Sequence, residues 1–124
     1  MNAFDSFFKR YAERYMAGDA EAVAAMYEAP LLAVREGRAI HLPDKAAVRE
    51  HLAGLMDAYG KAGAVRADVA ALDVLPLGAY SAVATVRWHV LDADGGLVRD
   101  FSSTYHLLWD DPTWRILSYT NHDA

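Results

Sequence analysis

The chain has 124 residues, a formal net charge of −5 at neutral pH and no cysteine. Because this length can bury a substantial core without a metal or disulfide, we expect a single domain over residues 1–124. The lack of cysteine excludes disulfides, thiol nucleophiles and cysteine-ligated metals. No basic run is present, which argues against nucleic acid or an anionic membrane surface as a partner. Asp5 and Lys9 interrupt the apolar residues near the N-terminus, so we expect neither a signal peptide nor a membrane span, and a cytoplasmic location.

Three helices are predicted in the first half of the chain. Apolar residues at helical spacing begin at Phe4, and Gly18 is typical of a helix end. Asp19 is suited to cap a second, short helix, whose apolar stripe includes Tyr27 and ends before Pro30. The third helix follows Pro43-Asp44 and ends at Gly60.

The other segments alternate in hydrophobicity as strands do. Turn residues separate them: Glu36-Gly37 in the first hairpin, and glycines or Pro112 between the last three strands. We expect Trp114 and Ile116 to face opposite to Leu117 and Tyr119. The predicted strands are Leu31–Arg35, Arg38–Leu42, Val65–Leu75, Tyr80–Leu91, Arg99–Trp109 and Trp114–Asn121.

Helices followed by long consecutive strands predict an α+β fold in which the helices pack against one face of a curved sheet. If the aromatic first helix and the aliphatic third helix both lie on the concave side, the sheet forms a cone around them. The open end of such a cone leaves a pocket.

The order of these elements resembles the nuclear transport factor two-like superfamily, and most closely its polyketide-cyclase-like (SnoaL-like) domains. The resemblance rests on Tyr15–Asp19, on Gly37 with His41–Lys45, and on Trp109–Ile116. It implies a cystatin-like roll, a cone-shaped curved antiparallel sheet wrapped around three N-terminal helices. The superfamily contains ketosteroid isomerases, scytalone dehydratases, limonene-epoxide hydrolases and polyketide cyclases, together with members that bind ligands or partners without chemistry. Function must therefore be argued from the site.

The isomerase pattern carries over only in part. The tyrosine that stabilises the oxyanion in the isomerases corresponds to Tyr11, and the carboxylic acid that assists it corresponds to Tyr105, whose phenol could also donate a hydrogen bond. The position of the general-base aspartate corresponds to Arg35, which cannot accept a proton.

Aromatic residues on the inward faces are the candidate pocket lining, although a tyrosine at such a position is more often an ordinary core residue. Four residues are candidates for catalysis: Tyr11, Tyr105, His41 and His122. The histidines are included because histidine titrates near neutrality and both lie at strand ends, near the expected mouth of the cone. The expected ligand-binding residues are Tyr11, Tyr15, Met56, Tyr59, Trp88, Phe101, Tyr105 and Tyr119.

No metal-ligand spacing and no nucleotide-cofactor or serine-hydrolase motif occurs, so we expect neither a metal nor a cofactor. Two functions stay open. The first is binding of a small apolar or aromatic molecule, with cofactor-free proton transfer of the isomerase, cyclase or dehydratase type as the associated chemistry. The second is a non-enzymatic dimerisation or protein-interaction module. For either, apolar residues on both faces of the last strand predict a homodimer through the outer face of the sheet, where His106 is also expected.

Overall fold

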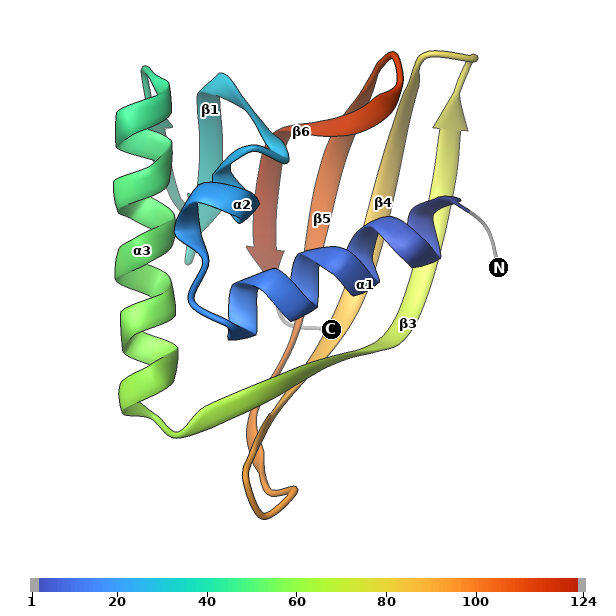
Figure 1. Cartoon of the computed structure of the whole chain (residues 1–124). Helices are drawn as coiled ribbons and strands as arrows, with labels where there is room; N and C mark the ends of the chain where they lie inside the picture. The colour runs from blue at the N-terminus through green and yellow to red at the C-terminus, as the bar shows by residue number, and fades with distance from the viewer. Residues whose placement is uncertain (1–2, 123–124) are drawn as a thin grey trace.

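Three helices lie across one face of a curved six-stranded sheet in the computed structural model, which describes residues 3–122 (Figure 1). The helix α1 crosses the concave face, and α3 stands beside the edge formed by the first two strands (Figure 1). This arrangement confirms the predicted α+β cone. The elements are α1 (Ala3–Met16), α2 (Ala20–Ala24), β1 (Tyr27–Arg35), β2 (Arg38–Leu42), α3 (Lys45–Lys61), β3 (Ala64–Leu77), β4 (Ser81–Asp92), β5 (Leu97–Asp110) and β6 (Thr113–His122).

The ends of the helices follow from local chemistry. Gly18 follows the end of α1 and has a φ of +74°, a left-handed backbone conformation that costs glycine little. The carboxylate of Asp19 accepts a hydrogen bond from the Ala22 amide at 3.1 Å, and that of Asp44 accepts one from the Ala47 amide at 2.9 Å. Each carboxylate satisfies an amide that has no partner within its helix, as an N-cap residue does.

The sheet is mixed, with strand order β2-β1-β6-β5-β4-β3. All neighbouring strands are antiparallel except β1 and β6, which run parallel. The sequence predicts a wholly antiparallel sheet, and the structure differs from this prediction at the β1–β6 pair. Between the two strands of this parallel pair the chain forms β2, α3, β3, β4 and β5, and β6 then returns beside β1.

The strand β1 begins at Tyr27, a residue that the sequence assigns to the stripe of the second helix. That assignment is wrong, because α2 ends at Ala24. The Ile116 amide donates to the carbonyl of Met26 at 2.9 Å, and Tyr27 pairs with Ile116. This pairing turns the Tyr27 side chain into the interior, where only 3% of its surface is exposed.

An irregularity in β6 turns two large side chains to the same face. His106 pairs with Ser118 and Leu107 with Ile116, so Leu117 is an extra residue opposite β5. Ile116 and Tyr119 are consequently both buried, with 0% and 4% of their surfaces exposed. The sequence prediction that they lie on opposite faces is wrong because it assumes unbroken alternation.

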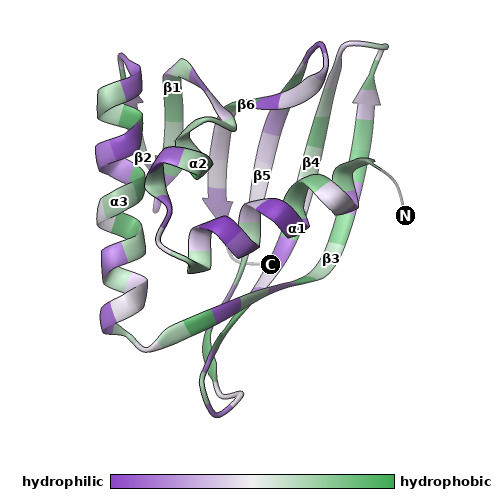
Figure 2. Cartoon of the chain, in the orientation of Figure 1, coloured by the Kyte–Doolittle hydropathy of each residue, from purple (hydrophilic) through white to green (hydrophobic). Residues whose placement is uncertain are grey.

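The hydrophobic core fills the space between the helices and the concave face of the sheet. Hydrophilic residues cover much of the side of α1 that faces away from the sheet (Figure 2). On the other side of α1, Phe7 and Phe8 are almost completely buried, and Leu52 of α3 is buried with them. At the end of the sheet that lies under the start of α1, the rings of Phe4 and Trp114 pack at a centroid distance of 4.9 Å. This contact packs the start of α1 against the start of β6.

Candidate functional site

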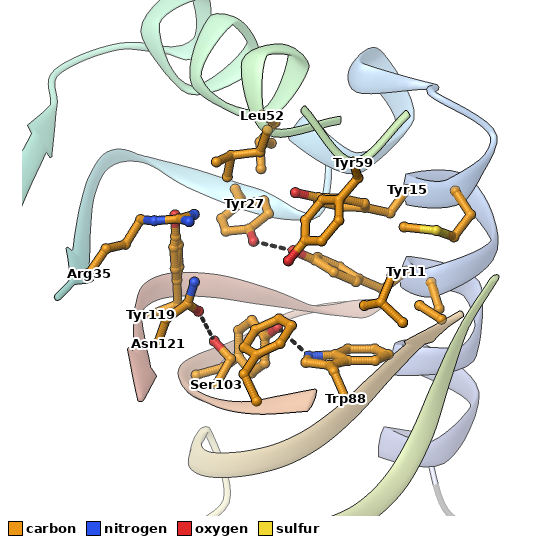
Figure 3. A pocket seen from close by; sticks show the side chains of 17 residues that line it. Tyr11, Tyr15, Tyr27, Arg35, Leu52, Tyr59, Trp88, Ser103, Tyr119 and Asn121 are labelled. Atoms are coloured by element: carbon orange, nitrogen blue, oxygen red, sulfur yellow. Dashed lines mark hydrogen bonds between the residues drawn. The ribbon is translucent and has the colours of Figure 1, made fainter. Parts of the chain in front are cut away.

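An internal cavity lies between the concave face of the sheet, α1 and α3 (Figure 3). It leaves about 50 Å³ open to the centres of water molecules, enough for a few waters by the usual volume criterion. Six of the seven tyrosines of the chain line it. The lining residues are Tyr11, Ala12, Tyr15, Met16, Tyr27, Arg35, Leu52, Leu55, Tyr59, Ala67, Trp88, Val90, Phe101, Ser103, Tyr105, Tyr119 and Asn121.

Two tyrosines form a hydrogen-bonded pair at the inner end of the cavity. The hydroxyls of Tyr11 and Tyr27 are 2.6 Å apart (Figure 3). Both side chains are buried, and burial raises the pKa of each phenol well above its ordinary value. Because the charged form is disfavoured without water, both remain neutral hydrogen-bonding groups at physiological pH.

Tyr105 lies beside this pair and is held by a tryptophan. The Trp88 indole Nε1–H donates to the Tyr105 hydroxyl at 3.0 Å (Figure 3). An indole N–H can only donate, so the Tyr105 oxygen is the acceptor and its own proton remains available to another group. Burial raises the pKa of Tyr105 to about 12. Its ring meets that of Tyr11 edge-on at 6.0 Å, and both rings border the cavity.

Polar groups from three elements line or border the cavity. Ser103 donates to the side-chain oxygen of Asn121 at 2.7 Å, and Arg99 donates to the Tyr59 hydroxyl at 2.9 Å. The Arg99 guanidinium also lies 4.0 Å from the centre of the Phe101 ring, a cation–π geometry. Since arginine can only donate, the Tyr59 hydroxyl keeps its proton for a further acceptor.

Arg35, at the end of β1, is the one charged residue among the residues that line the cavity. It is half-buried, and its guanidinium faces Tyr119 (Figure 3). Burial raises the pKa of Tyr119, while the hydrogen bond and charge of Arg35 oppose that rise. Arg35 therefore gives the mouth of a largely neutral cavity a positive charge.

His51 of α3 contacts the hydroxyl of the same phenol. Its Nε2 atom is 2.6 Å from the Tyr119 hydroxyl. Burial lowers the pKa of His51, and the positive charge of Arg35 lowers it further. The imidazole is thus predominantly neutral at pH 7 and can accept a proton.

Seven of the eight expected ligand-binding residues line the cavity, and Met56 does not. On α3 the cavity-facing row consists of Leu52, Leu55 and Tyr59, at the spacing of one helix face. Met56 is buried, but it is directed to the corner near Gly18. The sequence correctly predicted that Met56 faces the interior, but not which residues it contacts there.

The expected histidines lie elsewhere. His41 is exposed on β2 and pairs with Leu32, itself 44% exposed. His122 is exposed at the end of β6, with its Nε2 atom 2.8 Å from the Thr104 hydroxyl. Strand alternation places both on the outer face, so the expectation that they approach the mouth is wrong. His106 also lies on the outer face, where its Nε2 atom is 2.9 Å from the Ser81 hydroxyl.

Three residues of this region were not selected from the sequence as site residues. Tyr27 was assigned to a helix, Arg35 was noted only as unable to accept a proton, and His51 was not among the candidate histidines. The sequence carried a signal for His51, because it precedes Leu55 by four residues and so shares a face of the helix with it. Between residues 3 and 122, no three histidine, aspartate or glutamate side chains gather as a metal would require.

The family model described as "NTF2-like protein (DUF6841)" matches residues 2–124. The chain belongs to this NTF2-like family. This agrees with the resemblance inferred from the sequence. None of the curated proteins matches the chain significantly.

Solved structures share the fold. An NTF2-like protein with a cystatin-like fold from Novosphingobium aromaticivorans is 20% identical, with a TM-score of 0.74 over 94% of this chain and 76% of that chain. An NTF2-like protein of unknown function from Shewanella oneidensis is 18% identical, with a TM-score of 0.74 over 97% and 96%. The yeast UBP3-associated protein BRE5 is 16% identical, with a TM-score of 0.72 over 94% and 90%. At these identities the likeness concerns the fold alone.

Proposed function

We propose that this protein binds a small, mostly apolar or aromatic molecule in the tyrosine-lined cavity. The observation that carries the proposal is the convergence of six tyrosines, Trp88 and Phe101 on one internal space. Aromatic walls with a few directed polar groups are the usual lining of small-molecule sites. The hydroxyl proton left over at Tyr59 supplies a donor that an apolar core does not need.

The cavity is small for such a ligand. Ligand pockets usually hold roughly 300–1,000 Å³, and an engineered cavity of about 150 Å³ accommodates benzene. Tyr15 and Tyr59 are half-buried at the rim, with their rings 6.0 Å apart. We propose that these two side chains turn outward when a ligand enters.

A thermal-shift screen against aromatic polyketides, steroids, terpenoid epoxides and small hydroxy-ketones tests this proposal. A ligand at about a hundred times its dissociation constant adds roughly 2.7 kcal/mol of stability, which moves the melting temperature by several degrees. Ala67→Phe, which fills the cavity from β3, should abolish the shift. Ala71→Phe, on the outer face of the same strand, should retain it. A shift that survives Ala67→Phe unchanged would place the ligand elsewhere and contradict the proposal.

The contact between Tyr119 and His51 favours a second function, cofactor-free proton transfer. The Tyr119 oxygen can take a proton from a bound substrate as its own proton passes to the neutral His51 ring, so that no free phenolate has to form. Isomerases, cyclases and dehydratases use this kind of chemistry. Exchange of acidic carbon-bound protons of a bound ketone in D₂O tests it: exchange should occur with the native protein and be lost in Tyr119→Phe and His51→Gln.

A homodimer through the outer sheet face remains part of the proposal. Leu75, Leu77 and Leu108 are 61%, 45% and 37% exposed, and Leu77 and Leu108 flank Ser81 in adjacent strands. The rival function, an interaction module without a ligand, uses the same surface, and the solved relative BRE5 is described as UBP3-associated. A cytoplasmic location and a single-domain organisation also stay predictions. Within residues 3–122, no helix has the length and apolar character of a membrane span.

A further inference from the structure

The one charged side chain among the described residues that line the cavity is a cation, that of Arg35. Among residues 3–122, no aspartate or glutamate lines it, and no carboxylate forms an ion pair with Arg35. The half-buried Arg115, by contrast, lies 3.1 Å from both Glu28 and Asp110. Partial burial of a cation is costly unless an anion compensates it. Within residues 3–122, no carboxylate compensates Arg35 in this way.

The polar groups beside Arg35 are hydrogen-bond donors. Tyr59 accepts a bond from Arg99, which can only donate, so the Tyr59 proton is available to a ligand. Burial keeps Tyr11, Tyr15 and Tyr105 in the protonated form by raising their pKa values. A cavity with one cation and neutral O–H donors is complementary to a ligand that carries acceptor oxygens and one negative charge.

Resting on the proposed ligand-binding function, we propose that the cavity takes small aromatic carboxylic acids, with the carboxylate on Arg35 and the ring among the tyrosines. A planar carboxylate matches the two parallel N–H groups of a guanidinium. The other guanidinium at the rim, that of Arg99, is already engaged by the Tyr59 hydroxyl and the Phe101 ring. Arg35 therefore balances one charge, whereas a phosphate dianion would carry an uncompensated charge into an apolar space. Arg35 is at the rim and Trp88 lies deeper, so the acid group points outward and the ring inward (Figure 3).

The test is calorimetric titration with benzoate and phenylacetate beside their uncharged amides, benzamide and phenylacetamide, which have nearly the same shape. The native protein should bind each acid more tightly than its amide. Arg35→Met should weaken the acids roughly ten- to a hundredfold, the range expected for losing a hydrogen bond to a charged group, and leave the amides unchanged. Arg35→Lys should restore part of the preference for acids.

Arg38→Met is the matched control. Arg38 pairs with Arg35 across the β1–β2 hairpin but is exposed and does not line the cavity. The Arg38→Met substitution removes the same charge from the same hairpin. Because Arg38 lies outside the cavity, this variant should bind the acids with nearly the native affinity. Thermal unfolding without ligand confirms that each variant folds.

The outcomes separate this inference from the function on which it rests. Equal affinity for acids and amides, with no effect of Arg35→Met, would overturn the acid preference while leaving cavity binding intact. An equal loss for acids and amides in Arg35→Met would overturn it too, since the effect would then be steric. If no acid or amide binds and no compound of the thermal-shift screen raises the melting temperature, the proposed binding function itself is contradicted.

Discussion

The Tyr119 hydroxyl lies 2.6 Å from Nε2 of His51, 68 positions away in the chain, and the Arg35 guanidinium faces the same phenol. The three residues come from β6, α3 and β1. The arrangement therefore exists only when the parallel β1–β6 pair and the α3 packing are both in place. It couples the charge at the mouth of the cavity to a histidine outside it.

The pH dependence of stability should report this coupling. The pKa of His51 is lower in the folded protein than in the unfolded chain, where it is about 6.5. The unfolded chain therefore binds more protons in the window below pH 6.5, and the free energy of unfolding falls as the pH is lowered through that window. Thermal unfolding between pH 7.5 and 5.5 should show a shallower fall in His51→Gln than in the native protein.

His41→Gln is the control for that comparison, because His41 is exposed on β2. It should keep the native slope. An NMR titration adds a direct test: Arg35→Met removes a positive charge near the ring and should raise the pKa of His51. An unchanged His51 titration in Arg35→Met would show that the charge does not reach the imidazole.

The buried pair of tyrosine hydroxyls should show strong energetic coupling. Tyr27→Phe removes one partner and leaves the buried Tyr11 hydroxyl without its 2.6 Å hydrogen bond, at a cost of about 1–3 kcal/mol. Tyr11→Phe should cost a similar amount. The double variant should cost less than the sum, because it leaves no buried hydroxyl unpaired. Urea unfolding of the four proteins measures the cycle, and additive costs would argue against the pair.

Phe8 is the central packing residue beneath the cavity. It has no exposed surface, and its ring lies 4.9 Å from that of Tyr105 and 6.3 Å from that of Trp88. Phe8→Ala should lower the free energy of unfolding by about 3–5 kcal/mol through lost contacts and a new void. Tyr80→Ala, at a position 70% exposed, should change it by less than about 0.5 kcal/mol. Chemical unfolding measures both changes in the free energy of unfolding. Similar losses in Phe8→Ala and Tyr80→Ala would contradict the central packing role of Phe8.

The outer-face dimer predicts a particle of twice the 13.6 kDa chain mass in light scattering. Leu75→Asp combined with Leu108→Asp should reduce it to the single-chain mass, because both residues lie exposed on that face. Leu97→Asp changes an equally exposed leucine beside the β4–β5 turn and should leave the dimer intact. A single-chain mass for the native protein would contradict the proposed dimer.

The long hairpins were predictable because their signals are local. Asp92–Gly96 carries glycines suited to a tight turn, and Gly95 takes φ +82° there. Alternation along β5 correctly placed Phe101 and Tyr105 on the buried face. Helix ends at Gly18 and Asp44 followed from capping chemistry in the same way.

What the sequence missed depends on contacts between distant segments. The start of β1 at Tyr27 follows from pairing with β6, which no local pattern records. The extra residue at Leu117 breaks the alternation without any glycine or proline to mark it. The place of His51 against Tyr119 requires knowing how α3 sits on the sheet. The cavity walls were thus predictable by residue type, whereas the polar groups at its mouth were not.

The most direct test of ligand binding in the cavity follows the three tryptophan indole N–H signals by NMR during titration with a ligand found in the screen. Trp88 lines the cavity, whereas Trp109 and Trp114 pack against each other at the β5–β6 turn, with ring centroids 5.5 Å apart. Assignment by Trp88→Phe identifies the reporter. The account predicts that the Trp88 signal moves with ligand concentration while the other two stay. Movement of Trp109 and Trp114 without Trp88 would contradict it.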